Sequence, residues 1–135
     1  MKVSKYRIIT VALIILLSLL LCSCESQNNG ISMTLDKSTI SPTGATLEIS
    51  NNREDDIYVG NNYSVQKKTN NEWTKLDGNM DFFMDAKILP SGESLSFSLD
   101  WSEYYGELPD GDYRIEKVVL LTSGESILLY CEFSI

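Results

Sequence analysis

The residue types that carry most enzyme chemistry are sparse in this chain of 135 residues. Histidine is absent, and the three cysteines are Cys22, Cys24 and Cys131. Without an imidazole the chain has no Ser-His-Asp or Cys-His relay and no His-ligated zinc site. The formal net charge of −8 argues against a nucleic acid partner, because lysine and arginine must neutralise its phosphates.

Cys131 is predicted to be a core residue. Along the chain it alternates with polar neighbours and shares a face with Leu129 and Phe133. A buried cysteine packs as a small hydrophobic side chain, and a nucleophilic thiol needs a nearby base. We therefore expect no catalysis by Cys131. No other convergent set of polar groups indicates an active site, so we expect the protein not to be an enzyme.

Acidic residues gather in one loop, residues 77–85. Asp77 and Asp81 stand where a calcium loop has its first ligands, but Phe82 replaces the required glycine and Ile88 the required glutamate. Two interpretations stay open, weak calcium binding by these oxygens and a solvated acidic loop. The composition favours the solvated loop, and no metal or other cofactor is expected.

Aromatic residues in two connections are the candidate binding residues. Tyr104 and Tyr105 lie in the connection Ser102–Gly106, and Phe82 and Phe83 lie in the acidic loop. Exposed aromatic side chains on loops are effective binding anchors. The competing interpretation, which the size of the domain favours, is that one residue of each pair closes an end of a small core.

The N-terminus has the organisation of a secretory signal. Lys2, Lys5 and Arg7 precede an apolar stretch, residues 8–21. This stretch of 14 residues has the length of a signal-peptide core, whereas a membrane-spanning helix needs about 20 apolar residues.

Residues 21–24, Leu-Cys-Ser-Cys, resemble the lipobox of bacterial lipoproteins. In that motif a thiol receives a diacylglycerol and the signal peptide is cut just before it. The resemblance implies a lipoprotein signal peptide over residues 1–23 and a lipid on Cys24. Cys22 is the weaker alternative because Leu21 would precede the cut, and an uncleaved anchor is a further alternative. Each interpretation places the domain on the extracytoplasmic face of the cell membrane.

The chain after this signal is strongly acidic. Removal of residues 1–23 takes away three positive charges and changes the formal net charge from −8 to −11. Such a domain repels anionic lipid headgroups, so we expect it to meet the membrane only through its lipid. Residues 24–30 are polar and end in Gly30, which predicts a flexible tether.

From residue 31 onward, apolar and polar residues alternate with the period of strands that bury one face. The clearest strands are predicted at residues 45–49, 95–101, 113–121 and 129–135. Weaker strands are predicted at residues 31–36, 56–59, 62–68, 72–76 and 84–89. Turn residues separate them at short intervals, and no window forms an amphipathic helix of about ten residues. The pattern predicts an all-β, antiparallel immunoglobulin-like β-sandwich of about seven to nine strands over residues 31–135.

Three residue patterns in these strands predict further local features. Asn70 and Asn71 suit a tight hairpin turn, because asparagine tolerates a positive φ. Tyr113 follows a turn and opens a late strand, so it is either the tyrosine of a tyrosine corner or an ordinary strand tyrosine. Lys117 is the polar exception on the apolar face of the same strand.

Several motifs resemble a bacterial immunoglobulin-like domain family that occurs in secreted proteins and lipoproteins. The most specific stretch runs from Trp101 to Lys117, and further matches are Asn51 and Asn52, Leu89–Glu93 and the closing Glu132–Ile135. The similarity covers about residues 38–135, by comparison with the size of such a domain. It implies the sandwich fold, without an established activity or functional residue.

A looser likeness is to the intracellular proteinase inhibitor family, which is also a small sandwich. The shared order comprises Trp73, the Phe82 and Phe83 loop, the turn at Pro90, Trp101 and the turn Pro109–Tyr113. The export signal departs from that family, and no reactive-loop residue can be matched.

We therefore expect a lipid-anchored domain of the cell envelope with a non-catalytic binding or structural role. Its partner would be an envelope protein or a glycan. The alternative is an inhibitor of a secreted protease or other hydrolase.

Overall fold

The computed structural model describes residues 25–78 and 85–135, which form strands and one short helix. The elements in chain order are β1 (Glu25–Asn28), β2 (Ile31–Leu35), β3 (Gly44–Asn51), β4 (Ile57–Val59), β5 (Ser64–Thr69), β6 (Glu72–Lys75), β7 (Lys87–Leu89), β8 (Ser94–Asp100), α2 (Ser102–Tyr105), β9 (Asp112–Leu121) and β10 (Ser126–Ser134). No helix of this part of the chain is long and apolar enough to cross a membrane.

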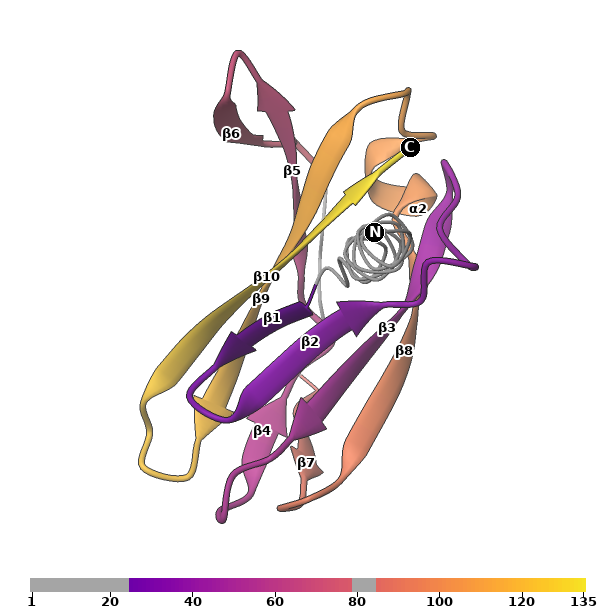
Figure 1. The fold of residues 1–135 in the computed structure, drawn as a ribbon. Helices are drawn as coiled ribbons and strands as arrows, with labels where there is room; N and C mark the ends of the chain where they lie inside the picture. Colours follow the sequence, from indigo (N-terminus) through magenta and orange to yellow (C-terminus); the bar gives the residue numbers. More distant parts are fainter. Residues whose placement is uncertain (1–24, 79–84) are drawn as a thin grey trace, which may run out of the picture.

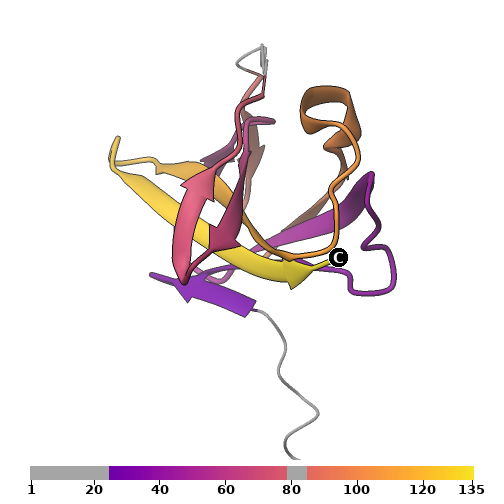
Figure 2. The ribbon, with the colours of Figure 1, turned by 90° about the horizontal axis from the view of Figure 1, so that it is seen from above.

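Two antiparallel sheets face one another (Figures 1 and 2). The four-stranded sheet has the order β1-β2-β3-β8. The six-stranded sheet has the order β6-β5-β9-β4-β7, and β10 pairs with β9 along its length. This arrangement confirms the predicted all-β immunoglobulin-like sandwich, and each strand expected after residue 31 is present with small shifts of its ends.

The segment expected to be a flexible tether contains a strand. β1 pairs with β2, with Asn28 opposite Ile31, and it adds one strand to the predicted set. Asn29 and Gly30 make the turn with φ angles of 51° and 81°, which these residue types adopt more readily than others. The residues of β1 are all polar, so the sequence shows no alternation of apolar and polar residues there. The strand forms through backbone pairing at the edge of the sheet. The predicted signal peptide and Cys24 lie outside the described residues.

The core lies between the sheets and is filled by the inward residues of both. Trp101, Tyr113 and Phe133 stack at one end, with ring centroids 5.0 Å apart for Trp101 and Phe133 and 5.6 Å apart for Tyr113 and Phe133. Trp101 is fully buried, and its indole N–H donates to the carbonyl of Pro42 at 2.9 Å. Cys131 is 1% exposed, which confirms its predicted place in the core.

Tyr113 forms a tyrosine corner. Its side chain is fully buried, and its hydroxyl donates to the carbonyl of Pro109 at 2.7 Å. This bond ties the start of β9 to the turn just before it, which is the geometry of the corner in immunoglobulin-like sandwiches. Of the two interpretations of this residue, the structure selects the corner.

Lys117 fills an interruption in the six-stranded sheet. β5 pairs with the first half of β9 and β4 with its last residues, so the chain departs from β9 at residues 60–63. The ammonium of Lys117 donates to the carbonyls of Gly60 at 2.6 Å and Asn62 at 2.9 Å, both in this interruption. The side chain is 2% exposed, and its burial lowers the pKa of the ammonium to about 8.

Candidate functional site

The two tyrosines predicted as binding anchors belong to α2, directly after β8. Both are half-buried, and Tyr105 packs against the core. The Tyr105 hydroxyl accepts a hydrogen bond from the backbone N–H of Val65 at 3.4 Å, and burial raises its pKa. Tyr105 therefore closes one end of the sandwich, as the competing interpretation expected. Phe82 and Phe83 lie outside the described residues, so their role stays a prediction.

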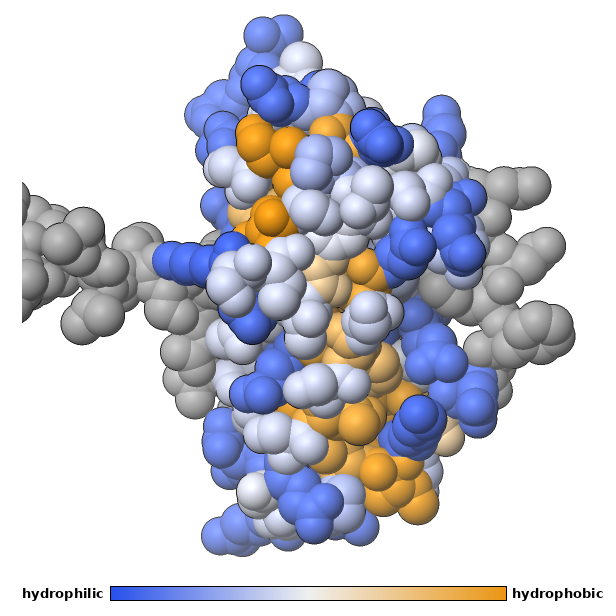
Figure 3. Space-filling model, turned by 90° about the vertical axis from the view of Figure 1, so that its right-hand side faces the viewer, coloured by the Kyte–Doolittle hydropathy of each residue, from blue (hydrophilic) through white to orange (hydrophobic). Residues whose placement is uncertain are grey.

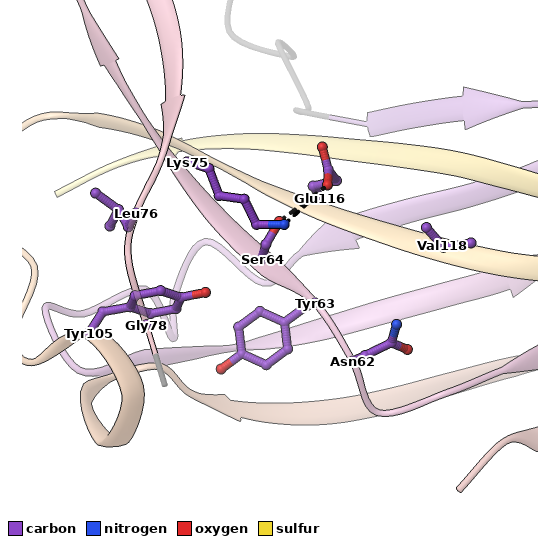
Figure 4. Close-up of a pocket in the computed structure, with 9 residues that line it drawn as sticks. All are labelled: Asn62, Tyr63, Ser64, Lys75, Leu76, Gly78, Tyr105, Glu116 and Val118. Atoms are coloured by element: carbon purple, nitrogen blue, oxygen red, sulfur yellow. Dashed lines mark hydrogen bonds and ion pairs between the residues drawn. The ribbon is translucent and has the colours of Figure 1, made fainter. Parts of the chain in front are cut away.

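A cavity of about 380 Å³ lies beside Tyr105 (Figure 4). Its lining is Asn62, Tyr63, Ser64, Lys75, Leu76, Gly78, Tyr105, Glu116 and Val118. Tyr63 is 8% exposed, and burial raises the pKa of its hydroxyl far above the ordinary value, with Tyr105 as the next cause. Both phenols are therefore neutral at physiological pH and supply polar but uncharged groups.

The charged groups near this cavity bind one another. Glu116 accepts hydrogen bonds from the amide of Gln66 at 2.8 Å and from the hydroxyl of Ser64 at 3.3 Å. The ammonium of Lys75 lies 4.0 Å from the same carboxylate. Gln66 in turn accepts from Nε of Arg114 at 2.7 Å. This network joins β5 to β9 and holds the carboxylate in a structural role.

Arg114 also lies between two aromatic rings on the outer face of the six-stranded sheet. Its guanidinium carbon is 4.7 Å from the ring centroid of Trp73 and 4.1 Å from that of Tyr130. The ammonium of Lys68 is 5.4 Å from the Trp73 centroid. Cation–π attraction of this kind orders β6, β9 and β10 against one another. The ring faces that a sugar would stack on thus already carry cations.

Apolar side chains cluster on the same outer face, nearer to β4 and β7. Each of these five is between 38% and 58% exposed, and together they are named here the outer apolar patch: Tyr58, Ile88, Val118, Leu120 and Leu128. The strand register makes the patch continuous, because Ile88 stands opposite Tyr58, Tyr58 opposite Leu120 and Leu128 opposite Val118. Single exposed apolar residues are ordinary on a protein surface, whereas a cluster marks an interaction site.

Sequence reasoning missed this patch because it used alternation to assign one apolar face to each strand. The signal was present as uninterrupted apolar runs at residues 118–121 in β9 and 127–129 in β10. Such runs place apolar side chains on both faces of a strand. The strand period alone identifies the buried face and leaves the opposite one unassigned.

Little of the acidic loop falls within the structure. Asp77 and Asp85 are exposed, and the other residues proposed for weak calcium binding lie outside the described residues. Over residues 25–78 and 85–135, no group of three or more acidic or sulfur side chains is placed to hold a metal ion.

Comparisons with known proteins identify the fold family. The profile of a family described as "Bacterial Ig-like domain" matches residues 27–134. No curated protein matches the chain in sequence. A similar solved structure is described as the X-ray structure of the Northeast Structural Genomics Consortium target SoR45. It is 14% identical, with a TM-score of 0.53, over 80% of this chain and 87% of that one. At that identity the likeness shows the fold alone. Since the family profile covers most of its length, the chain belongs to the bacterial Ig-like domain family.

Proposed function

We propose that this chain is a non-catalytic immunoglobulin-like domain, held by a lipid on Cys24 at the extracytoplasmic face of the cell membrane, that binds another protein. The observation that carries the binding role is the outer apolar patch. It presents five exposed apolar side chains on one face of the six-stranded sheet, where a partner can cover them together. Membership of the bacterial Ig-like domain family supports the non-catalytic role.

A protein suits this surface better than a glycan. Ile88, Val118, Leu120 and Leu128 are aliphatic, and aliphatic side chains gain most from burial against other apolar surface. The aromatic rings of the same face, Trp73 and Tyr130, already stack with Arg114. The net charge of the domain also indicates the kind of partner surface. A domain with a formal charge of −11 after cleavage favours a partner with a basic margin around its own apolar contact.

A lipid on Cys24 would account for the proposed location. A diacylglycerol supplies two acyl chains, which together give stable membrane anchoring where one chain gives marginal binding. Because the chain after Cys24 is acidic, the lipid and not the protein surface would hold the domain at the membrane.

The test is site-specific photo-crosslinking of the full-length chain in a lipoprotein-competent bacterium. A photoreactive residue replaces Leu120 in the patch, and the control replaces Lys37, which is exposed in the connection between β2 and β3. We expect a discrete protein adduct from position 120, its loss when Leu128→Ser is added, and no such adduct from position 37. Equal adducts from both positions, or an adduct that survives Leu128→Ser, would contradict binding through the patch.

The alternative function, inhibition of a secreted hydrolase, requires an exposed reactive loop. The connection after β8 is packed on the core through Tyr105, and the connection between β6 and β7 falls largely outside the described residues. Inhibition therefore stays a prediction. Slowed turnover of a secreted protease by the full-length chain would support it.

A further inference from the structure

β8 is an edge strand of the four-stranded sheet. β3 pairs with one side of β8, and no strand of the described residues pairs with the other. The N–H of Asn51 donates to the carbonyl of Glu93 at 2.9 Å. With the register of the two strands, this bond shows that the odd-numbered residues of β8 are the ones hydrogen-bonded to β3. Because hydrogen-bonded and non-hydrogen-bonded pairs alternate along antiparallel strands, the even-numbered residues from Ser94 to Asp100 turn their backbone N–H and C=O groups toward the open side.

This edge lacks the sequence features that usually prevent another strand from pairing with an edge strand. Natural edge strands carry lysine, proline or bulges, or are very short. β8 reads Ser-Leu-Ser-Phe-Ser-Leu-Asp, with seven paired residues and a single charge, on Asp100 at its end. Leu95 and Phe97 are only half-buried against the core. The side of the molecule on which β8 lies shows a hydrophobic band between hydrophilic margins (Figure 3).

The side-chain order of β8 is complementary to itself. Leu95, Ser96, Phe97, Ser98 and Leu99 read the same in both directions. A second copy placed antiparallel, with a two-fold axis at Phe97, sets each leucine opposite a leucine and each serine opposite a serine. In this register the residues whose backbone groups face outward meet one another, so each such pair exchanges both N–H···O bonds. The two Phe97 side chains meet at the central pair without hydrogen bonds, where cross-strand side chains are closest.

We propose that two copies of the chain associate through β8 in this register and join their four-stranded sheets into one continuous sheet. Association would cover Leu95 and Phe97 of both copies and complete the backbone pairing of the edge. The inference goes beyond the proposed function and does not require the lipid. Two anchored copies in one membrane would nevertheless meet at a higher effective concentration. Since both copies are acidic outside the strand, added salt is expected to strengthen the association.

The register can be tested by disulfide formation in purified full-length protein in detergent. One chain carries Ser96→Cys, a second chain with a different tag carries Ser98→Cys, and the two are mixed and oxidised. In the proposed dimer these positions face one another at a Cα separation of about 5.5 Å, within disulfide range. Two Ser96→Cys chains, or two Ser98→Cys chains, are offset to about 7–8 Å. We expect the mixed pair to exceed both like pairs and the wild type, which supplies the native cysteine background. Equal yields would overturn the register.

A second experiment tests whether β8 is the dimer interface. Light scattering measures the mass of the full-length protein and so distinguishes monomer from dimer. Ser96→Pro removes an outward N–H that β3 does not use, so the fold should persist, which a thermal melt checks. Ser98→Lys adds a charge opposite Ser96 of the second copy without changing the backbone. Both variants should be monomeric, while the wild type and the control Leu128→Ser, changed in the outer apolar patch, should be dimeric. A monomeric wild type, or a Ser96→Pro variant that stays dimeric, would overturn the proposal.

Discussion

Lys117 occupies a position where the strand period calls for an aliphatic side chain. Its neighbours on the inner face of β9, Ile115 and Val119, are fully buried and apolar. The lysine is needed there because the chain leaves β9 between β4 and β5, and carbonyls in that interruption turn to its ammonium. A buried carbonyl without a donor costs free energy, so one cation replaces two missing sheet contacts.

Substitution of Lys117 should therefore destabilise the fold. Lys117→Met keeps an unbranched apolar stem of similar shape but removes the ammonium, which leaves the carbonyls of Gly60 and Asn62 without this donor. We expect the free energy of unfolding at pH 7 to fall by about 1–3 kcal/mol, measured by urea denaturation. An unchanged denaturation midpoint would show that the two hydrogen bonds contribute nothing to stability.

The same residue predicts how stability depends on pH. Burial lowers the pKa of Lys117 to about 8 in the folded protein, from an ordinary value of 10.5 in the unfolded chain. Between these values the unfolded chain binds more protons, so stability should increase as pH increases. The raised pKa values of Tyr63 and Tyr105 act in the opposite direction above their ordinary value of 10.0. Wild type and Lys117→Met are therefore compared between about pH 8 and 9.5. The wild type alone should gain stability, and a parallel gain in the variant would assign the effect to another group.

Tyr113→Phe tests the tyrosine corner at the same scale. The ring stays in the core while the hydrogen bond to the carbonyl of Pro109 is lost. We expect a loss of about 1 kcal/mol in the free energy of unfolding. The matched control is Tyr58→Phe, whose side chain is 38% exposed and should change stability by less than about 0.5 kcal/mol. Equal effects of the two variants would contradict a special role for the corner.

At the scale of elements, the hairpin between β5 and β6 shows a local sequence determining a local structure. Thr69 pairs with Glu72 across a two-residue turn, and Asn70 and Asn71 adopt φ angles of 51° and 66°. Two consecutive positive φ angles suit the twist of a two-residue hairpin. This turn was predicted from the asparagine pair and is confirmed by the structure.

Asn71 offers a matched pair of substitutions. Asn71→Gly should stabilise the protein by a few tenths of a kcal/mol, up to about 1 kcal/mol, since glycine adopts this backbone without a steric penalty. Asn71→Val should destabilise it by about 1–3 kcal/mol, because a β-branched residue is strained at positive φ. Thermal unfolding of the two variants beside the wild type measures both effects. A glycine variant less stable than the wild type would contradict the backbone argument.

The strand positions and the buried faces were readable where apolar and polar residues alternate, as in β3 and β8. β1 was not readable, because its polar residues Glu25–Asn28 pair through their backbone. The outer apolar patch was hidden for the opposite reason, since β9 and β10 contain apolar residues on both faces. The hydrogen-bond acceptors of Lys117 could not be predicted from the sequence either. They are backbone carbonyls of residues more than fifty positions away along the chain.

At the scale of the whole molecule, the position of β1 bears on the proposed anchoring. The strand begins at Glu25, the residue directly after Cys24, and is paired with β2 from its first residue. A lipid on Cys24 would then be joined to the sheet with almost no spacer. The domain would stand close to the membrane, and its negative charge would disfavour contact with anionic headgroups. Anchoring is thus the part of the proposal on which the location of both binding surfaces depends.

The most direct measurement is the intact mass and membrane partition of the full-length chain expressed in a lipoprotein-competent bacterium, beside Cys24→Ala. Cys22→Ala is the matched control, since it changes the neighbouring cysteine alone. We predict that the wild type and Cys22→Ala lose residues 1–23, gain the mass of a diacylglycerol and fractionate with the membrane, and that Cys24→Ala does none of these. A wild type that is released without lipid, or a Cys24→Ala variant that is still cleaved, lipidated and bound to the membrane, would contradict the account.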